Sequence, residues 1–183
     1  MAKIVVVYHS GYGHTAAQAK AVFTGVESVE GVSVNLLKVE EVEANWESLD
    51  QADAIIFGSP TYMGSVSGQF KTFMDSTGGR WLEQKWKDKI AAGFTNSGSL
   101  SGDKLNTLIQ LTVFAAQHSM VWVGSSVLPN GRTDENINRI GSFLGAAAQS
   151  DHGSLEPSSG DLQTAQLFGE RVAQAALRWV RGK

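Results

Sequence analysis

Two short loops rich in glycine and hydroxyl residues constrain this chain most. They span residues 10–15 (SGYGHT) and 59–64 (SPTYMG), and each directly follows a short apolar run with the character of a buried strand. The first also leads into a helical pattern at residues 16–28, whose N-terminal amides can hold an anion together with the N–H groups of the loop. In open parallel sheets, ligands sit beyond the carboxyl ends of the strands where the strand order reverses. The two loops therefore predict one shared crevice for a mononucleotide.

The composition favours a single domain without disulfides. A chain of 183 residues can bury a large core as one domain, to which we assign residues 1–183. The absence of cysteine excludes thiolate ligands and a cysteine nucleophile and fits a reducing compartment, so we expect a cytoplasmic protein. The net charge of −3, with dispersed Lys and Arg, argues against nucleic acid as a partner. The apolar run after Lys3 is too short for a signal peptide or a membrane span.

Strand-like and helix-like segments alternate along the chain. Apolar and β-branched runs predict five strands, at residues 4–8, 32–39, 54–58, 89–95 and 120–124. Apolar spacing of three or four predicts helices at 16–28, 68–76, 105–118 and 162–179, and a short helix within 40–50. Such alternation predicts an α/β fold in which helices cover both faces of a parallel sheet. We expect turns to dominate residues 125–159.

The first loop leaves two classes of nucleotide open. The pattern G-x-G-x-x-A at residues 11–16 fits a loose dinucleotide fingerprint, for which Glu40 or Glu41 would be the acidic residue that holds a ribose. Ser10 and Thr15, however, bracket the loop with hydroxyls, which suits a terminal phosphate monoester and favours a mononucleotide such as a flavin. The lysine of the G-x-x-x-x-G-K-[ST] loop is missing, so hydrolysis of ATP or GTP has no support. A plain structural turn is the remaining alternative.

The second loop and a third one carry groups suited to a flat heterocycle. Pro60 and Gly64 fix an unusual backbone that frees N–H and C=O groups, and Tyr62 and Met63 are placed to line the face of a ring. The alternative is that Tyr62 caps the core. Residues 96–102 (NSGSLSG) follow the fourth predicted strand and add small donors at the same sheet edge. We expect the cofactor-binding residues to be Ser10, Gly11, Tyr12, Gly13, His14, Thr15, Pro60, Thr61, Tyr62, Met63, Gly64, Asn96, Ser97, Gly98, Ser99, Leu100, Ser101, Gly102 and His118.

Three side chains are candidates for the catalytic, substrate-facing side. Tyr12 lies in the first loop, Trp81 follows a glycine pair where a lid is expected, and His118 ends a helix before the fifth predicted strand. An imidazole at that place can hydrogen-bond a flavin carbonyl or an incoming acceptor. A core position for Trp81 and a helix-capping role for His118 are the alternatives. The other histidines show neither H-E-x-x-H spacing nor carboxylate pairing, so we predict no metal site.

These motifs carry a family resemblance. With residues 10–15, 58–81 (GSPTYMGSVSGQFKTFMDSTGGRW), 96–102 and 117–120 (QHSM), the chain resembles the flavodoxin-like NAD(P)H:quinone oxidoreductases of the WrbA type over nearly its whole length. The long second stretch is the specific part. The resemblance implies a three-layer flavodoxin-like fold with strand order 2-1-3-4-5, FMN as cofactor and a homotetramer. It also implies two-electron transfer from NADH or NADPH through FMN to a quinone, by a ping-pong mechanism.

The resemblance also implies roles for particular residues. Residues 10–15 would bind the FMN phosphate, and residues 61–64 and 97–102 would bind the ribityl chain and the isoalloxazine. His118 and Trp81 would face the substrate.

The chain departs from the family at three places. The crossing at residues 40–50 is shorter than the usual insertion, which makes a dimer an alternative to the tetramer. Tyr62 and Met63 stand where family members often carry arginine and phenylalanine, and Leu100 replaces a small residue. The last two departures bear on which substrate enters.

We therefore predict an FMN-dependent NAD(P)H:quinone oxidoreductase. One alternative is a flavodoxin-type electron carrier without a substrate of its own; such carriers dock through strongly acidic surfaces, and a net charge of −3 argues against it. The other alternative is a domain that binds NAD and no flavin. The physiological acceptor and the choice between NADH and NADPH are not encoded in any motif that we identify.

Overall fold

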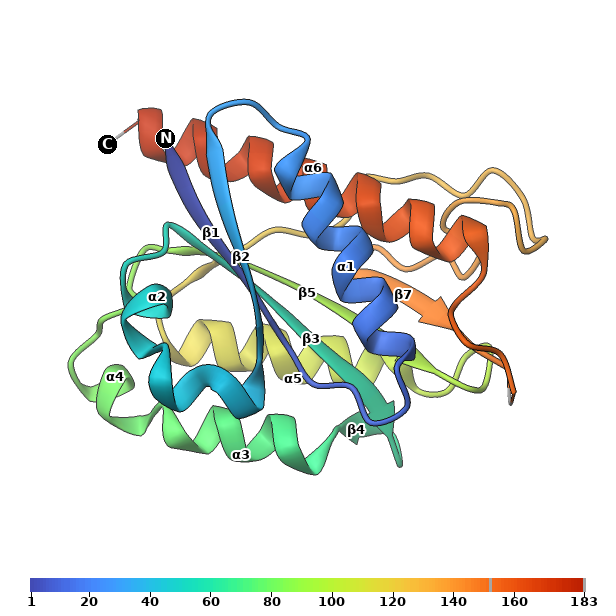
Figure 1. The fold of residues 1–183 in the computed structure, drawn as a ribbon, viewed down its shortest axis with the longest axis horizontal. Coiled ribbons are helices and arrows are strands. Elements are labelled where there is room, and N and C mark those ends of the chain that lie inside the picture. Colours follow the sequence, from blue (N-terminus) through green and yellow to red (C-terminus); the bar gives the residue numbers. More distant parts are fainter. Residues whose placement is uncertain (152, 183) are drawn as a thin grey trace.

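A parallel β-sheet forms the centre of the protein, and helices cover both of its faces (Figure 1). The structure, a computed structural model, describes residues 1–151 and 153–182. The main path of the sheet runs β2 (Val32–Lys38), β1 (Ala2–Tyr8), β3 (Ala54–Tyr62), β5 (Ile90–Ser97) and β6 (Val121–Trp122), with all of these pairs parallel. These are the five strands predicted from the sequence, and their spatial order confirms the expected 2-1-3-4-5.

The last position of the sheet is divided between two short strands. β6 pairs only with Ile90 and Ala91 at the start of β5, and β7 (Ala146–Gln149) pairs in parallel with the end of β5. Residues 123–145 leave the sheet between them. β7 lies within residues 125–159, where turns were expected to dominate, and it was not predicted because its sequence AAAQ lacks the β-branched and aromatic residues typical of strands. β4 (Ser65–Val66), also not predicted, is a short antiparallel partner of the end of β3.

Each face of the sheet packs against its own set of helices. α1 (His14–Glu27) and α6 (Ser159–Arg181) lie on one face, and the other elements lie on the opposite face (Figure 1): the 3₁₀-helix η1 (Val39–Ala44), α2 (Trp46–Asp50), α3 (Gly68–Ser76), α4 (Gly78–Leu82) and α5 (Lys104–Gln117). Successive side chains of a strand point to opposite faces. Ile4 and Val6 of β1 accordingly join the core under α1 and α6, and Val5 and Val7 join the second core.

This arrangement places the candidate loops together. Because β1, β3, β5 and β7 run in the same direction, the segments that follow them meet at one edge of the sheet. The four longer helices lie where the periodicity predicts them, whereas α4 was not predicted. Among the described residues, the structure has no helix with the length and apolarity that a membrane crossing requires.

Candidate functional site

A crevice of about 470 Å³ lies at the carboxyl edge of the sheet, within the size range of small-molecule sites. Four segments form it: the loop after β1, the end of β3, the end of β5 with Gly98, and the residues after β7. Its lining consists of Tyr12, His14, Thr15, Pro60, Thr61, Tyr62, Asn96, Ser97, Gly98, Ser150, Asp151, Gly153 and Ser154. Residues from all three predicted loops are therefore brought to one site.

The loop after β1 presents backbone amides to this crevice. The Ser10 hydroxyl accepts hydrogen bonds from the amides of Gly13 and Ala16, each 3.1 Å away, and so folds the loop onto the start of α1. Gly13 has a φ of 94°, a conformation that favours glycine. The amides of His14 and Thr15, the first two of α1, have no intrahelical acceptor, and within the described part of the chain they donate to no other group. An anion can satisfy them.

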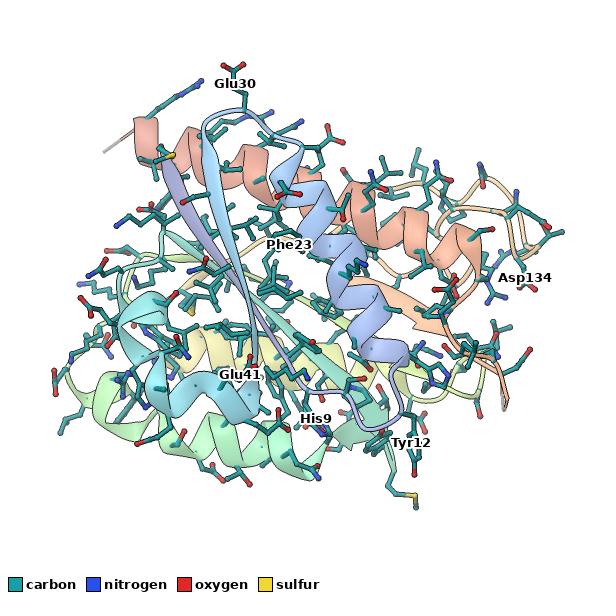
Figure 2. The ribbon with its side chains drawn as sticks, in the orientation of Figure 1. His9, Tyr12, Phe23, Glu30, Glu41 and Asp134 are labelled. Atoms are coloured by element: carbon teal, nitrogen blue, oxygen red, sulfur yellow. The ribbon has the colours of Figure 1, made fainter. Side chains whose placement is uncertain are left out.

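Two tyrosines form an aromatic wall beside that loop. The rings of Tyr12 and Tyr62 meet edge to face, with their centroids 6.1 Å apart. A Cβ on Gly11 would come within 2.5 Å of the Tyr62 hydroxyl, so any other residue at that position would require the Tyr62 side chain to shift. Tyr12 is 81% exposed at the tip of its loop (Figure 2), although its ring is large and apolar. Such a ring offers a planar ligand a surface for stacking.

Buried hydroxyls support the second loop from beneath. The Thr61 hydroxyl lies 2.8 Å from the hydroxyls of both Thr95 on β5 and Thr107 on α5. Thr61 therefore directs its side chain into the protein and not into the crevice.

A second buried contact lies where β1 ends. His9 Nδ1 lies 2.8 Å from the hydroxyl of Ser67, which also caps α3 by accepting from the amide of Phe70. Burial lowers the pKa of His9, and the nearby carboxylate of Glu40 partly opposes that shift. Neutral His9, which directly precedes the first loop (Figure 2), is thereby linked to α3, the helix that follows the second loop.

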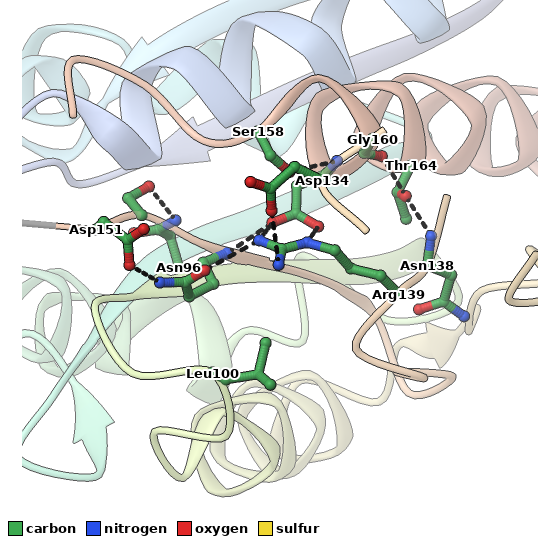
Figure 3. Close-up of polar contacts among 12 residues, drawn as sticks. Asn96, Leu100, Asp134, Asn138, Arg139, Asp151, Ser158, Gly160 and Thr164 are labelled. Carbon is green, nitrogen blue, oxygen red and sulfur yellow. Dashed lines mark hydrogen bonds and ion pairs between the residues drawn. The ribbon is translucent and has the colours of Figure 1, made fainter. Parts of the chain in front are cut away.

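Gln149, at the end of β7, holds the third and fourth loops. Its amide nitrogen donates to the Gly98 carbonyl, 2.9 Å away, and to the Asp151 carboxylate. Its amide oxygen accepts from Arg139 at 3.0 Å, and Arg139 in turn donates twice to the buried carboxylate of Asp161 (Figure 3). This chain of contacts runs from the N-terminus of α6 to the wall of the crevice, and it fixes the backbone at Gly98.

The structure does not bring His118 or Trp81 to this crevice. α5 begins beside the third loop and His118 follows its last residue, so the 14 residues of α5 carry it about 20 Å away. There His118 is 2% exposed, with Nε2 at 2.9 Å from the Thr77 hydroxyl and its ring packed on Trp86 and Phe114. Trp81, on α4, lies near the same far end. Within one chain, the expectation that these two side chains face the crevice is therefore corrected.

Several other predicted residues belong to the loops without lining the crevice. Ser10, Gly11 and Gly13 shape the first loop, and Met63 and Gly64 form the tip of the second. Ser99, Leu100, Ser101 and Gly102 lie beyond the lining part of the third loop, and Leu100 and Ser101 line a different cavity.

The sequence interpretation missed the fourth segment, which contributes Ser150, Asp151, Gly153 and Ser154. Ser150 accepts a hydrogen bond from the Asn96 side chain at 2.9 Å, and His14 Nε2 donates to the Ser154 carbonyl at 2.7 Å. The available signal was the turn-forming run after residue 149. It did not indicate a site loop because β7, the strand that it follows, had not been recognised. Among the residues that the structure describes, no group of three His, Asp or Glu side chains gathers as a metal site.

Comparison with known proteins then places the chain. Residues 28–133 match the sequence model of the family described as NADPH-dependent FMN reductase. The chain belongs to this flavodoxin-like family. It is 43% identical over 183 residues to the flavodoxin FldP of Pseudomonas aeruginosa, with 95% of this chain and 96% of that protein covered.

Solved structures agree with this assignment. A flavodoxin, WrbA-like protein from Agrobacterium tumefaciens is 44% identical, covers 97% of this chain and 99% of its own, and superposes with a TM-score of 0.78. A flavodoxin from the domain Archaea, 24% identical with 96% and 99% of the two chains covered, has a TM-score of 0.68 and supports the fold alone. The flavodoxin-like fold and the family resemblance inferred from the motifs are thereby confirmed.

The burial of His118 generates a pH prediction. Burial lowers the pKa of His118 to about 4, below the value near 6.5 of an unfolded histidine. The unfolded chain therefore binds a proton that the native state excludes, so the free energy of unfolding is highest above about pH 6.5 and falls between there and pH 4, by up to about 1.4 kcal/mol per pH unit. We expect His118→Gln to flatten the dependence seen in urea unfolding from pH 7 to pH 4.5. An unchanged slope would contradict the assignment.

Proposed function

We propose that the crevice binds FMN and that the protein is an NAD(P)H-dependent oxidoreductase whose acceptor is a quinone-type small molecule. The observation that carries the proposal is the pair of amides at His14 and Thr15, which face the crevice without an acceptor in the described chain. Family membership supports a flavin-binding protein over the alternative of a domain that binds NAD and no flavin.

The residues at the site fit FMN. Among the described residues, no Lys or Arg lines the crevice, so a phosphate there would be held by backbone amides, by the hydroxyl of Thr15 and by the positive end of α1. Asn96 and Ser97 offer polar groups to a polyhydroxylated chain, and Tyr12 offers an exposed ring to a planar one. This order of polar and aromatic groups corresponds to the phosphate, ribityl and isoalloxazine parts of FMN.

The flavin, when bound, supplies the chemistry of accepting and passing on a hydride. The chain itself supplies binding and orientation. The rigid contacts of Thr61 below the second loop and of Gln149 behind Gly98 hold the loops in one geometry. Tyr12, which is 81% exposed at the mouth, is placed to orient a flat donor or acceptor, and no residue is required as a general base for hydride transfer.

A second candidate is an electron carrier of the flavodoxin type. It is favoured by one observation, that the relative with 43% identity is named a flavodoxin. Both candidates use the same cofactor site and differ in whether nicotinamide and acceptor react at the protein.

The phosphate assignment predicts selectivity among flavins. FMN should bind at least 100-fold more tightly than riboflavin, because charge-assisted hydrogen bonds contribute about 1.5–3 kcal/mol each. Ser10→Ala should reduce this preference, since Ser10 organises the loop, whereas Ser28→Ala at the far end of α1 should not. Fluorescence titration of the three apoproteins with FMN and with riboflavin measures all six affinities. Equal binding of FMN and riboflavin by the unaltered protein would exclude a phosphate at this loop.

Turnover distinguishes the reductase from the carrier. With FMN bound, the protein should oxidise NADPH or NADH with benzoquinone and give parallel double-reciprocal lines, because donor and acceptor alternate in one place. In protein kept saturated with FMN, Tyr12→Ala should lower kcat/KM for the quinone several-fold, and Leu128→Ala, an exposed residue outside the crevice, should have no effect. Absence of NAD(P)H oxidation, together with stable one-electron reduction of the protein, would favour the carrier.

We also propose that the protein forms a homo-oligomer. Ile109 and Val113 lie at successive turns of α5 and are 44% and 54% exposed, and the only charged residue of that helix, Lys104, is buried. A second copy of the chain can cover such an uncharged apolar face without charge repulsion. Sedimentation velocity at micromolar concentration should show an oligomer that Ile109→Glu dissociates. A monomer in the unaltered protein would refute this part of the proposal.

A further inference from the structure

A second cavity, of about 370 Å³, lies on the other side of the third loop. One wall is the start of α5 with the loop before it. The other wall is the segment at residues 123–145, which leaves the sheet between β6 and β7. In the described part of the chain the cavity shares no lining residue with the crevice proposed to bind FMN, and nothing in the proposed function uses it.

The charged residues that line this cavity are all basic. Lys104, Arg132 and Arg139 line it, and no carboxylate does among the described residues. Arg139 is compensated elsewhere, by salt bridges of 3.0 Å to both Asp134 and Asp161 (Figure 3). Arg132 forms no salt bridge within the described chain and donates only to the carbonyl of Arg139. In a protein of net charge −3, this concentration of positive charge in a cavity requires an explanation.

Lys104 is the unusual member of the set. It is 3% exposed, and its ammonium donates to two neutral groups, the carbonyls of Ser99 and Leu100, the latter at 3.0 Å. In the described part of the structure it forms no salt bridge. A buried charge held only by carbonyls is incompletely compensated, so an anion in the adjoining cavity would stabilise it.

The rim of the cavity is apolar. Leu100, Leu105 and Phe143 line it and are 57%, 61% and 49% exposed, an arrangement that leaves large apolar surfaces in water around a concave site. Figure 3 shows Leu100 on the loop between β5 and α5, and Ser97 and Gly98 at the start of that loop line the other crevice. Exposed apolar groups around a cavity are typical of ligand grooves, and they favour a ligand with an apolar body over an inorganic anion.

We propose that this cavity binds an amphiphilic organic anion, of which an aromatic carboxylate is the simplest form. Its carboxylate would contact Lys104 and Arg132, and its apolar body would contact Leu100, Leu105 and Phe143. The site is independent of whether the neighbouring crevice holds FMN.

The experiment is a calorimetric titration of the full chain with 2-naphthoate and with its neutral analogue 2-naphthamide, each with and without saturating FMN. The proposal predicts that naphthoate binds with a stoichiometry of one per chain, that naphthamide binds at least tenfold more weakly, and that FMN does not displace naphthoate. Equal binding of the two compounds would overturn it. Displacement by FMN would also overturn it, because the ligand would then occupy the flavin crevice.

Matched variants locate the binding. Lys104→Met and Arg132→Gln should each weaken naphthoate at least fivefold, whereas Lys71→Met, an exposed lysine of α3, should have no effect. Arg132 is exposed, so its variant tests the proposal even if replacement of the buried Lys104 impairs folding. Unaltered naphthoate affinity in Arg132→Gln and in any folded Lys104→Met would exclude the site.

The pH dependence gives a readout that a merely structural role of Lys104 would not produce. Burial lowers the pKa of Lys104 to about 8; Asp161 on α6 opposes this shift and Arg139 adds to it. The arginines stay charged in this range. Naphthoate affinity should therefore fall between pH 7 and pH 9 in the unaltered protein and remain constant in Lys104→Arg. A parallel decline in both proteins would contradict the proposal.

Discussion

The parallel pairing of β1, β3 and β5 is the constraint on which the rest of the site depends. It sends three loops that are far apart in the sequence to one edge of the sheet, and it places the first amides of α1 beside them. The first residues of the second and third loops still pair within the sheet, with β4 and β7, and the rest of each loop extends beyond it. Their geometry comes from groups behind them, which explains why buried hydroxyls and amides surround the crevice.

The contacts behind the loops differ in chemistry from those within the crevice. Thr61, Thr95 and Thr107 join two strands to α5 through their hydroxyls, and Arg139 joins Asp161 to Gln149. Buried polar groups of this kind are stable only when each is paired, and paired networks define a single geometry. The amides of His14 and Thr15 lie in the crevice and have no acceptor in the described chain. Binding and support are thus assigned to different residues of the same loops.

Much of the fold was predictable because its signals are local. The hydrophobic runs of β1, β3 and β5 and the periodicity of α1, α3, α5 and α6 determine those elements without reference to the rest of the chain. β7 was not predictable in the same way, since four residues of mostly alanine become a strand only through pairing with β5.

The site was predictable as far as it lies directly after the recognised strands, which includes Tyr12, Thr15, Tyr62 and Asn96. The segment at residues 150–154 was missed together with β7. His118 and Trp81 show a different limit, because a residue type suited to catalysis does not reveal at which edge of the sheet it lies. The length of α5 decides that question for His118.

The central claim is that an FMN phosphate binds the amides at the start of α1. A crystal structure of the protein grown with FMN tests it most directly. The account predicts the phosphate oxygens within hydrogen-bond distance of the amides of His14 and Thr15, with the ring system beside Tyr12. A phosphate bound elsewhere, or a flavin that occupies a different cavity, would contradict it.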